Sequence, residues 1–578
     1  MWSCRIARKP PLITRGGEES YHSFTSRKMR RMGYDYIVVG AGSAGCLLAS
    51  DLAKLAPTLK IALIEAGGND AYQPWVHIPV GYLYCIGNPS MDWLFKTSSC
   101  KGLNGRSLLY PRGKILGGCS SINGMIYMRG QSEDYERWAN VSQNPDWQWS
   151  RCLERYKSFE DYHRGPCSMH GSGNQWRVEK QRLHWDVLDV FQDAAVEKNI
   201  PKTEDFNTGN NEGVGYFDVN QRDGWRLNTR QAFLRQVPNN LDIITNTCVH
   251  SLVFDDDNGS RCKGVNAFNE RNGEESIMHI NDGEHSEVIL SAGSIGSVQI
   301  LERSGIGNTD VLQNVDSGRG IRTRVELKGV GENLQDHLQI RTVFKVSCLN
   351  TLNTTSASSW GKFKIGLEYA MNRSGPMAMA PSQLGCFTRS SHEHSRPNLQ
   401  YHVQPLSLEK FGDPLHEFNA FTASVCNLRP TSRGSVHITS SGIKTPPMID
   451  PNYLDTAEDK KIAADAIRLT RDIVMTTEAF RKYQPCEVSP GENLLSDSEL
   501  WKAAGDIGTT IFHPVGTCKM GHMDDETSVV DGKLKVLGTE KLRIADASIM
   551  PYITSGNTAS PTMMIAKTLV ENLAKELS

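Results

Sequence analysis

The apolar and polar residues in the first part of the chain follow one another in the order strand, turn, helix, strand. The run YDYIVVG at 34–40 predicts a short β-strand, and CLLASDLAKLA at 46–56 has the spacing of a helix. KIALIEAGG at 60–68 predicts a second buried strand, which ends near Glu65. This order predicts an α/β unit of the Rossmann-like type.

The region from about 338 to 505 has a different pattern. Polar and apolar residues alternate in NLQYHVQP at 398–405 and in FTASVCNL at 421–428, which predicts antiparallel strands. We therefore expect a second part in which an antiparallel sheet is backed by helices and caps the first unit. The segment 458–476 predicts one such amphipathic helix, whose apolar positions are Ile462, Ala466, Ile467, Leu469 and Ile473.

Length and composition fit this two-part fold. A chain of 578 residues is too long for one ordinary core, and its 39% hydrophobic and 22% charged residues are typical of a globular protein. A net charge of −2 gives no electrostatic footprint for nucleic acid or for an anionic membrane. No apolar run reaches the roughly 18 residues of a transmembrane helix. The 14 cysteines are scattered and form no CxxC pair, so we expect neither a zinc ribbon nor a thioredoxin-like site.

The first 32 residues differ from the rest of the chain. They contain six arginines and two lysines against Glu18 and Glu19, several serines and threonines, and no long apolar run. This composition is typical of an organellar transit peptide rather than a secretory signal, and it predicts a mitochondrial location. The alternatives are a disordered extension or a later start at Met29 or Met32, and the protein would then be cytoplasmic.

The glycines of GAGSAG lie between the first strand and the helix. Gly40 permits a tight turn, Gly42 lets the backbone approach a pyrophosphate at the helix N-terminus, and Gly45 allows close packing of helix on strand. Glu65, twenty residues after Gly45, can accept hydrogen bonds from a ribose diol. This arrangement predicts a dinucleotide site but does not separate FAD from NAD. The site also includes the neighbouring residues Ser43, Ala44 and Ala66.

Two further segments are candidates for the wall of this site. The glycine-rich stretch YPRGKILGGCSSINGMIYMRG at 110–130 suits a loop whose backbone lies flat against a planar ligand. The alternative is a tight loop that packs only on the sheet. The segment 82–95 predicts a lid or a cover on the adenine side. In it, Trp93 could pack on the cofactor or only on the core.

TIFHPVGTCKMG at 510–521 contains the candidate catalytic residue His513. An imidazole has a reference pKa of about 6.5, which suits a general base near neutral pH, and Pro514 restricts the backbone of His513 to extended geometry. A structural role is the alternative. We expect no metal site, because His522 is the only other histidine nearby and the acidic run at 524–526 has the character of a solvated turn.

Six motifs in the same order make the chain resemble the glucose-methanol-choline (GMC) family of FAD-dependent oxidoreductases. The resemblance covers essentially everything after residue 33. The stretches LNGRSLLYPRGK and NLRPTSRGSV are most similar to medium-chain alcohol dehydrogenases and choline dehydrogenases within that family. The six motifs are YDYIVVGAGSAG (34–45), GKILGGCSSINGMIYMRG (113–130), GSIGSVQILERSGIG (293–307), VGENLQDH (330–337), HPVGTCKMG (513–521) and LRIADASIMPYITSGNTASPTMMIA (542–566).

The resemblance implies FAD as the cofactor. The position of a histidine that binds flavin covalently in some relatives is Ile122 here, so non-covalent binding is expected. Val249 would meet the adenine through its backbone, and Asp546 and Ala547 would lie near the pyrophosphate and ribityl chain. The implied flavin neighbours are Gly117, Gly118, Cys119, Asn123, Gly124 and Met125 beside the ring, and Asn557, Thr558 and Pro561 under its pyrimidine side, where a helix N-terminus can stabilise reduced flavin.

The resemblance also implies a division of the chain. Residues 33–337 would form the FAD-binding domain, with insertions that contribute to the substrate lobe. Residues 338–505 would form the substrate-binding domain. Residues 506–578 would close the FAD domain and carry the catalytic pair.

The implied reaction is oxidation of a primary alcohol to an aldehyde. His513 would accept the hydroxyl proton while a hydride passes to the flavin, and Asn557 would hold the substrate oxygen. Electrons would pass to a quinone-like acceptor or an electron-transfer protein, and peripheral association with a membrane is left open. The alternatives are choline as the substrate, with Trp360, Glu368 and Tyr369 as candidates for its ammonium site, an oxidase that uses O₂, a lyase, or a flavin-binding protein without turnover.

Overall fold

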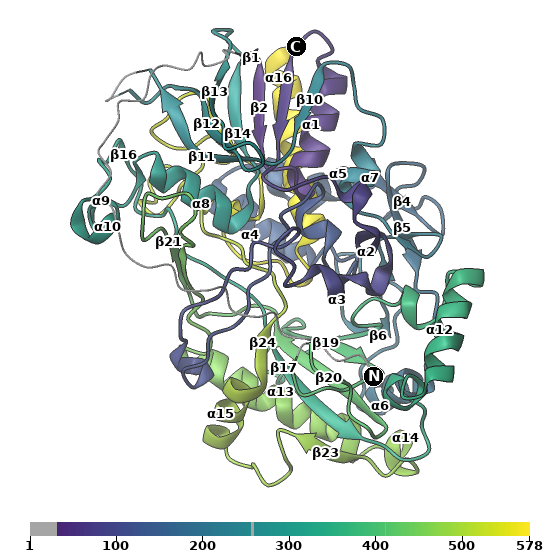
Figure 1. Cartoon of the computed structure of the whole chain (residues 1–578). Coiled ribbons are helices and arrows are strands. Elements are labelled where there is room, and N and C mark those ends of the chain that lie inside the picture. The colour runs from purple at the N-terminus through teal and green to yellow at the C-terminus, as the bar shows by residue number, and fades with distance from the viewer. Residues whose placement is uncertain (1–31, 256–258, 411) are drawn as a thin grey trace, which may run out of the picture.

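The computed structural model describes residues 32–255, 259–410 and 412–578, which form two lobes (Figure 1). The upper lobe contains a parallel sheet and the lower lobe an antiparallel sheet, which confirms the predicted fold class. The predicted targeting segment 1–32 lies outside the described residues except for its last residue. No helix in the described ranges is long and apolar enough to cross a membrane.

The upper lobe is built on a five-stranded sheet in the order β10-β3-β2-β14-β25, in which all neighbours are parallel. Every residue of β2 and β3 is buried, as expected for apolar strands covered on both faces. Helices α1 and α16 pack against each other beside this sheet, and β1 (Met32–Tyr34), β13, β12 and β11 form a four-stranded second sheet on its other side (Figure 1). The bounds are β2 Tyr36–Val39, α1 Ser43–Leu55, β3 Ile61–Ile64, β10 Leu241–Ile244, β11 Thr247–Phe254, β12 Cys262–Asn269, β13 Glu275–Ile280, β14 Glu287–Leu290, β25 Leu542–Ile544 and α16 Ala559–Leu577.

The connections of the parallel sheet diverge between β2 and β14. From β2 the chain passes through α1 to β3 on one side, whereas β14 leads into α8 (Gly293–Arg303) and its other neighbour is β25. The carboxyl ends of β2 and β14 therefore border a crevice at Gly40 and Ser291. In open parallel sheets, ligands bind at such a point.

The lower lobe contains a seven-stranded antiparallel sheet in the order β23-β17-β20-β19-β18-β6, with β24 also paired to β17. The predicted strands at 398–405 and 421–428 are β19 and β20, and the predicted helix at 458–476 is α13. The bounds are β6 Gly213–Tyr216, β17 Leu338–Lys345, β18 Leu384–Thr388, β19 Leu399–Gln404, β20 Ala420–Asn427, α13 Ala457–Met475, β23 Cys486–Ser489 and β24 Gly508–Thr510.

The antiparallel sheet has one apolar and one polar face. On the apolar face, side chains such as Phe344, Tyr401 and Phe421 are fully buried in one core with Ile462 and Ile467 of α13. Because side chains alternate along a strand, the intervening residues point to the opposite face, toward the upper lobe. Four of them line a cavity there: Gln339, Arg341, His402 and Gln404.

The two lobes are interleaved along the sequence. Strand β6 precedes residue 337 and β24 follows residue 505, yet both belong to the lower sheet. Conversely, β21 (Ser435–His437) contacts α8 of the upper lobe. The side chain of His437 makes this contact through Nδ1, which lies 2.7 Å from Glu302 Oε1, while its Nε2 lies 3.1 Å from Glu332 Oε1.

The His437 contact predicts a pH-dependent contribution to stability. Burial alone lowers the pKa of His437, but the hydrogen bonds to Glu302 and Glu332 outweigh it and raise that pKa to about 9. This contribution is complete below the unfolded pKa of about 6.5 and is lost as the pH rises through 9. We expect His437→Gln to lower the free energy of unfolding by about 3 kcal/mol at pH 6 and by much less above pH 9.5, measured by denaturant titration.

The exposed variant His392→Gln is the control, and its difference from the wild type should not change with pH. A destabilisation by His437→Gln that is the same at both pH values would contradict the assignment.

Candidate active site

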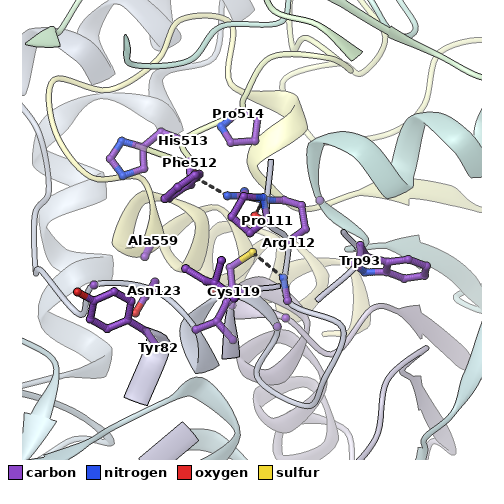
Figure 2. A pocket seen from close by; sticks show the side chains of 18 of the residues that line it. Tyr82, Trp93, Pro111, Arg112, Cys119, Asn123, Phe512, His513, Pro514 and Ala559 are labelled. Carbon is purple, nitrogen blue, oxygen red and sulfur yellow. Dashed lines mark hydrogen bonds between the residues drawn. The ribbon is translucent and has the colours of Figure 1, made fainter. Parts of the chain in front are cut away.

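A cavity of about 770 Å³ lies between the two lobes. Its walls come from the carboxyl ends of β2 and β14, from the loop 110–130 and from the polar face of the antiparallel sheet. In Figure 2, Cys119 and Asn123 of this loop lie opposite His513. A volume in the upper part of the range for ligand pockets suits a large cofactor together with a substrate.

The first glycine turn presents bare backbone to the cavity. A Cβ on Gly40, whose φ is +100°, would lie 2.5 Å from the carbonyl oxygen of Ser291, and a Cβ on Gly45 would lie 1.9 Å from that of Gly40. Gly42 begins α1 without a side-chain cap and lines the cavity. The first N–H groups of α1 are therefore available to an anion such as a pyrophosphate.

Glu65 follows the end of β3 and also lines the cavity. Its carboxylate accepts hydrogen bonds from the backbone N–H of Ala41 (2.9 Å) and of Gly67 (2.8 Å). Burial raises the pKa of Glu65 to about 7, while these two hydrogen bonds and Lys114 act in the opposite direction. A carboxylate has about four acceptor positions, so two remain for a ribose diol.

The second glycine cluster packs directly on the first. A Cβ on Gly118 would lie 2.7 Å from Gly42 Cα, so the loop touches the turn through backbone alone. Asn123 Oδ1 accepts hydrogen bonds from the backbone N–H of Met125 (3.0 Å) and from Arg226 Nη1 (2.9 Å), which fixes the part of the loop that lines the cavity. The loop therefore packs tightly on the first glycine turn and also lines the cavity, while its contact with a planar ligand stays a prediction.

Trp93 packs on protein side chains, which is one of the two kinds of contact expected for it; contact with the cofactor stays a prediction. Its ring is parallel to that of Phe95, with centroids 5.8 Å apart, and Lys114 Nζ lies 4.7 Å from the ring centroid. The side chain lines the cavity as well (Figure 2). Trp93 is thus held by protein groups and forms part of the cavity wall.

Asp546 caps the second helix that begins at the cavity. Its Oδ2 accepts hydrogen bonds from the backbone N–H of Gly293 (2.8 Å) and from Ser297 Oγ (2.6 Å), both in α8. The N-terminus of α8 is therefore already paired with a carboxylate, whereas that of α1 has no side-chain cap. This difference makes α1 the better anion site of the two.

The structure gathers most of the predicted site residues around one cavity. Three of them do not line it. Gly45 packs on the glycine turn, and Pro561 is buried in the first turn of α16. Gly117 lies within the 110–130 loop, directly before the short 3-10 helix Gly118–Ser121, and has a φ of +88°. The predicted residues that line it are Gly40, Gly42, Ser43, Ala44, Glu65, Ala66, Trp93, Gly118, Cys119, Asn123, Gly124, Met125, Val249, His513, Asp546, Ala547, Asn557 and Thr558.

The predicted catalytic pair is in direct contact. His513 Nε2 lies 3.2 Å from Asn557 Nδ2, and Asn557 Oδ1 accepts a hydrogen bond from Gln400 Nε2 at 3.3 Å. The amide of Asn557 therefore points its N–H group toward His513. Phe512 adopts a positive φ of 69°, and its carbonyl oxygen accepts a hydrogen bond from Arg112 Nη2 at 2.5 Å (Figure 2).

His337 fixes the tautomer of His513, a role that the sequence analysis missed. His337 Nε2 lies 3.1 Å from the carbonyl oxygen of Leu428, which can only accept, so this nitrogen carries a proton. Neutral His337 then accepts at Nδ1, which lies 3.0 Å from His513 Nδ1. His513 must donate there, so its Nε2 is unprotonated and accepts the hydrogen bond from Asn557 Nδ2.

The surroundings keep His513 neutral. Burial lowers its pKa well below the usual range, and the positive charge of His337, His402 or Arg112 would lower it further. Burial also lowers the pKa of His337 and brings that of His402 to about 3. The unprotonated Nε2 of His513 is therefore ready to accept a proton over the whole neutral pH range.

Asp336 holds the two histidines in register. Its Oδ1 accepts hydrogen bonds from the backbone N–H of His513 (2.8 Å) and of His337 (2.9 Å). Its Oδ2 accepts from Tyr110 Oη at 2.9 Å and also from Tyr453 and Thr510. Asp336 and His337 end the motif VGENLQDH, and the resemblance implied no role for either residue. The signal that the sequence offered was the adjacent aspartate and histidine at the end of this motif.

The cavity fits FAD better than a metal ion. Bare glycine backbone at an uncapped helix N-terminus suits the pyrophosphate, Glu65 suits a ribose, and the 110–130 loop gives a wall beside His513 for the flavin ring. In the described part of the chain, no three His, Cys, Asp or Glu side chains are grouped so that they could hold a metal.

Comparison with known proteins agrees with this geometry. Sequence models of the GMC oxidoreductase family match residues 34–339 and 430–566. An alcohol dehydrogenase [acceptor] of Pseudomonas putida is 36% identical over 94% of this chain and 96% of its own length. The mitochondrial choline dehydrogenase of Homo sapiens is 34% identical over 98% and 95%.

A crystal structure of pyridoxine 4-oxidase from Mesorbium loti superposes with a TM-score of 0.81 at 27% identity, over 93% of this chain and 99% of that one. These matches span nearly the whole chain, and GMC oxidoreductases use FAD. The chain therefore belongs to the GMC oxidoreductase family and is an FAD-dependent oxidoreductase.

Proposed function

We propose that this protein oxidises a primary alcohol to an aldehyde, with His513 as the general base and Asn557 as the residue that positions the substrate oxygen. The observation that supports this most directly is the unprotonated Nε2 of His513, which accepts a hydrogen bond from the Asn557 amide at 3.2 Å. A substrate hydroxyl can donate its proton to this nitrogen while it accepts a hydrogen bond from the amide. Non-covalently bound FAD supplies the hydride acceptor.

Choline is the second candidate substrate, because several relatives are named choline dehydrogenases. The three residues considered for an ammonium site do not line the cavity. Trp360 is 62% exposed on the helix α12 (Ser359–Asn372), Glu368 accepts a hydrogen bond from Ser374, and Tyr369 donates to the carbonyl oxygen of Gly224. We therefore favour an alcohol without a quaternary ammonium group.

We further propose a quinone-like electron acceptor that is reached at a membrane surface. Helix α12 exposes an apolar stripe, Trp360, Phe363, Leu367 and Met371, with 46–72% of each side chain accessible. Lys362 and Lys364 lie on the same exposed helix. Exposed aromatic residues beside lysines suit the interface of an anionic bilayer. An O₂-using oxidase would instead release peroxide under air.

The first prediction concerns the general base. We expect His513→Ala to retain FAD, measured by absorbance, but to lower the rate of anaerobic flavin reduction by a primary alcohol by at least about two orders of magnitude. The exposed variant His392→Ala should reduce its flavin at the wild-type rate. A near-normal rate in His513→Ala would exclude it as the base.

The second prediction concerns His337 as a positioning residue. We expect His337→Phe to lower the flavin reduction rate about tenfold or more, because His513 is no longer confined to one tautomer. Neutral His337 accepts a hydrogen bond from His513 and so favours the protonated form of His513, and its loss should therefore lower the pKa of His513 further. Since only neutral His513 is active, the acid limb of the pH–rate profile should move to lower pH. An unchanged pH–rate profile would contradict a role of the hydrogen bond between His337 and His513 in setting the pKa of His513.

The third prediction concerns the membrane. The wild-type enzyme should co-sediment with vesicles that contain anionic lipid, and the double variant Phe363→Glu, Leu367→Glu should remain in the supernatant because it places two charges in the stripe. Activity with a soluble dye should be equal for both proteins. Binding that is unaffected by the two charges would refute the assignment of this surface, and rapid anaerobic reoxidation by a soluble quinone would support the acceptor.

A further inference from the structure

Arg341 is a cationic side chain in the cavity wall, and none of the residues that the structure describes serves as its counterion. It lies on β17, two residues after Gln339 on the same face of the strand, and lines the cavity. Within residues 32–255, 259–410 and 412–578, no carboxylate lies within ion-pair distance of its guanidinium and no acceptor hydrogen-bonds to it. By contrast, Arg112, which also lines the cavity, donates to the carbonyl oxygens of Pro111 and Phe512.

The surroundings of Arg341 favour a partner of negative charge. Burial lowers the pKa of Arg341, and only the hydroxyl of Tyr82 acts in the other direction. A guanidinium removed from water without hydrogen-bond partners is unfavourable, and a planar carboxylate can satisfy it through two parallel hydrogen bonds. We therefore expect the ligand to carry an anionic group that pairs with the Arg341 guanidinium, because none of the described residues does.

The carboxylates of the cavity wall lie elsewhere. Glu65 and Asp546 follow the ends of β3 and β25 and are held by backbone N–H groups of the upper lobe. Asp413 is exposed, and its carboxylate accepts a hydrogen bond from the backbone N–H of Lys410. None of these three carboxylates pairs with Arg341, so its positive charge stays available to an anion and disfavours a cation such as choline.

Arg341 and the catalytic base His513 lie close enough together for one extended substrate to contact both. His337, which contacts His513, precedes it by four residues, and a strand rises about 3.3 Å per residue, so the two Cα atoms are about 13 Å apart. His402 lies on β19, which is separated from β17 by β20, and it lines the cavity as well; its buried Nε2 has no hydrogen-bond partner in the described structure. One substrate can therefore reach both ends if a chain of several carbons joins its hydroxyl to an anionic group.

We propose that Arg341 binds the carboxylate of the substrate, so that the preferred alcohol is a hydroxy acid with a spacer between its carbinol carbon and its carboxylate. This inference rests on the proposed alcohol oxidation and names its substrate class. The carboxylate pairs with the guanidinium while the hydroxyl lies between His513 and Asn557, and no further covalent step is required.

The test compares matched substrates with the FAD-loaded enzyme. Anaerobic flavin reduction is measured with a series of ω-hydroxy acids of increasing length, with their methyl esters, with n-alkanols and with choline. We expect the best hydroxy acid to have a kcat/KM about 10- to 100-fold above that of its ester, the range expected for a charge-assisted hydrogen bond. Arg341→Met should abolish this ratio mainly through KM, and Arg341→Lys should keep part of it.

Lys345→Met is the matched control, because Lys345 is an exposed cation at the end of the same strand and does not line the cavity. Its ratio should equal that of the wild type. Binding of an unreactive straight-chain carboxylate, followed by the change in flavin absorbance, gives a second readout that needs no turnover and should weaken in Arg341→Met.

The outcomes separate this inference from the proposed function. If n-alkanols and esters reduce the flavin as well as the hydroxy acids do, alcohol oxidation stands and the role of Arg341 is wrong. If no alcohol reduces the flavin but the unreactive carboxylate still binds through Arg341, the carboxylate site stands and the proposed reaction fails. A preference for choline over every hydroxy acid would overturn the inference.

Discussion

The carboxylate of Asp336 is the interaction on which the active site depends. It lies directly before β17, and it accepts hydrogen bonds from the backbone of both His337 and His513. Its second oxygen accepts from hydroxyl groups that come from the 110–130 loop, from the segment before α13 and from β24. One buried anion thus joins parts of the chain that are hundreds of residues apart, and an error in its position would displace the catalytic base.

A line of hydrogen bonds extends this constraint to the protonation state of the base. The carbonyl oxygen of Leu428 determines the tautomer of His337, and His337 determines that of His513. On the other side, Gln400 orients the amide of Asn557. The hydrogen bonds on both sides leave His513 Nε2 unprotonated and place it opposite the N–H donor of Asn557. Because His337 and His513 are both buried, these hydrogen bonds determine which of their ring nitrogens carry protons.

Local patterns predicted the elements of the fold well. The strand–turn–helix–strand order near residue 40 and the alternating strands at 398–405 and 421–428 were sufficient, since each depends on residues close in sequence. The cavity-lining residues of the glycine motifs followed for the same reason. Asp336, His337 and Arg341 were not assigned a role, because their importance arises from neighbours that the fold brings from distant segments. A polar residue on an alternating strand has the same pattern whether it faces solvent or a cavity.

The interleaving of the lobes has a consequence for the order of events during synthesis. Strand β25 and helix α16 are the last elements of the chain, yet β25 forms one edge of the parallel sheet and α16 packs on α1. The parallel sheet therefore cannot be completed until β25 and α16 have been synthesised, long after its first strand β2. Until then the edge of β14 that pairs with β25 has no partner strand, and unpaired apolar edges of this kind make a nascent chain prone to aggregation.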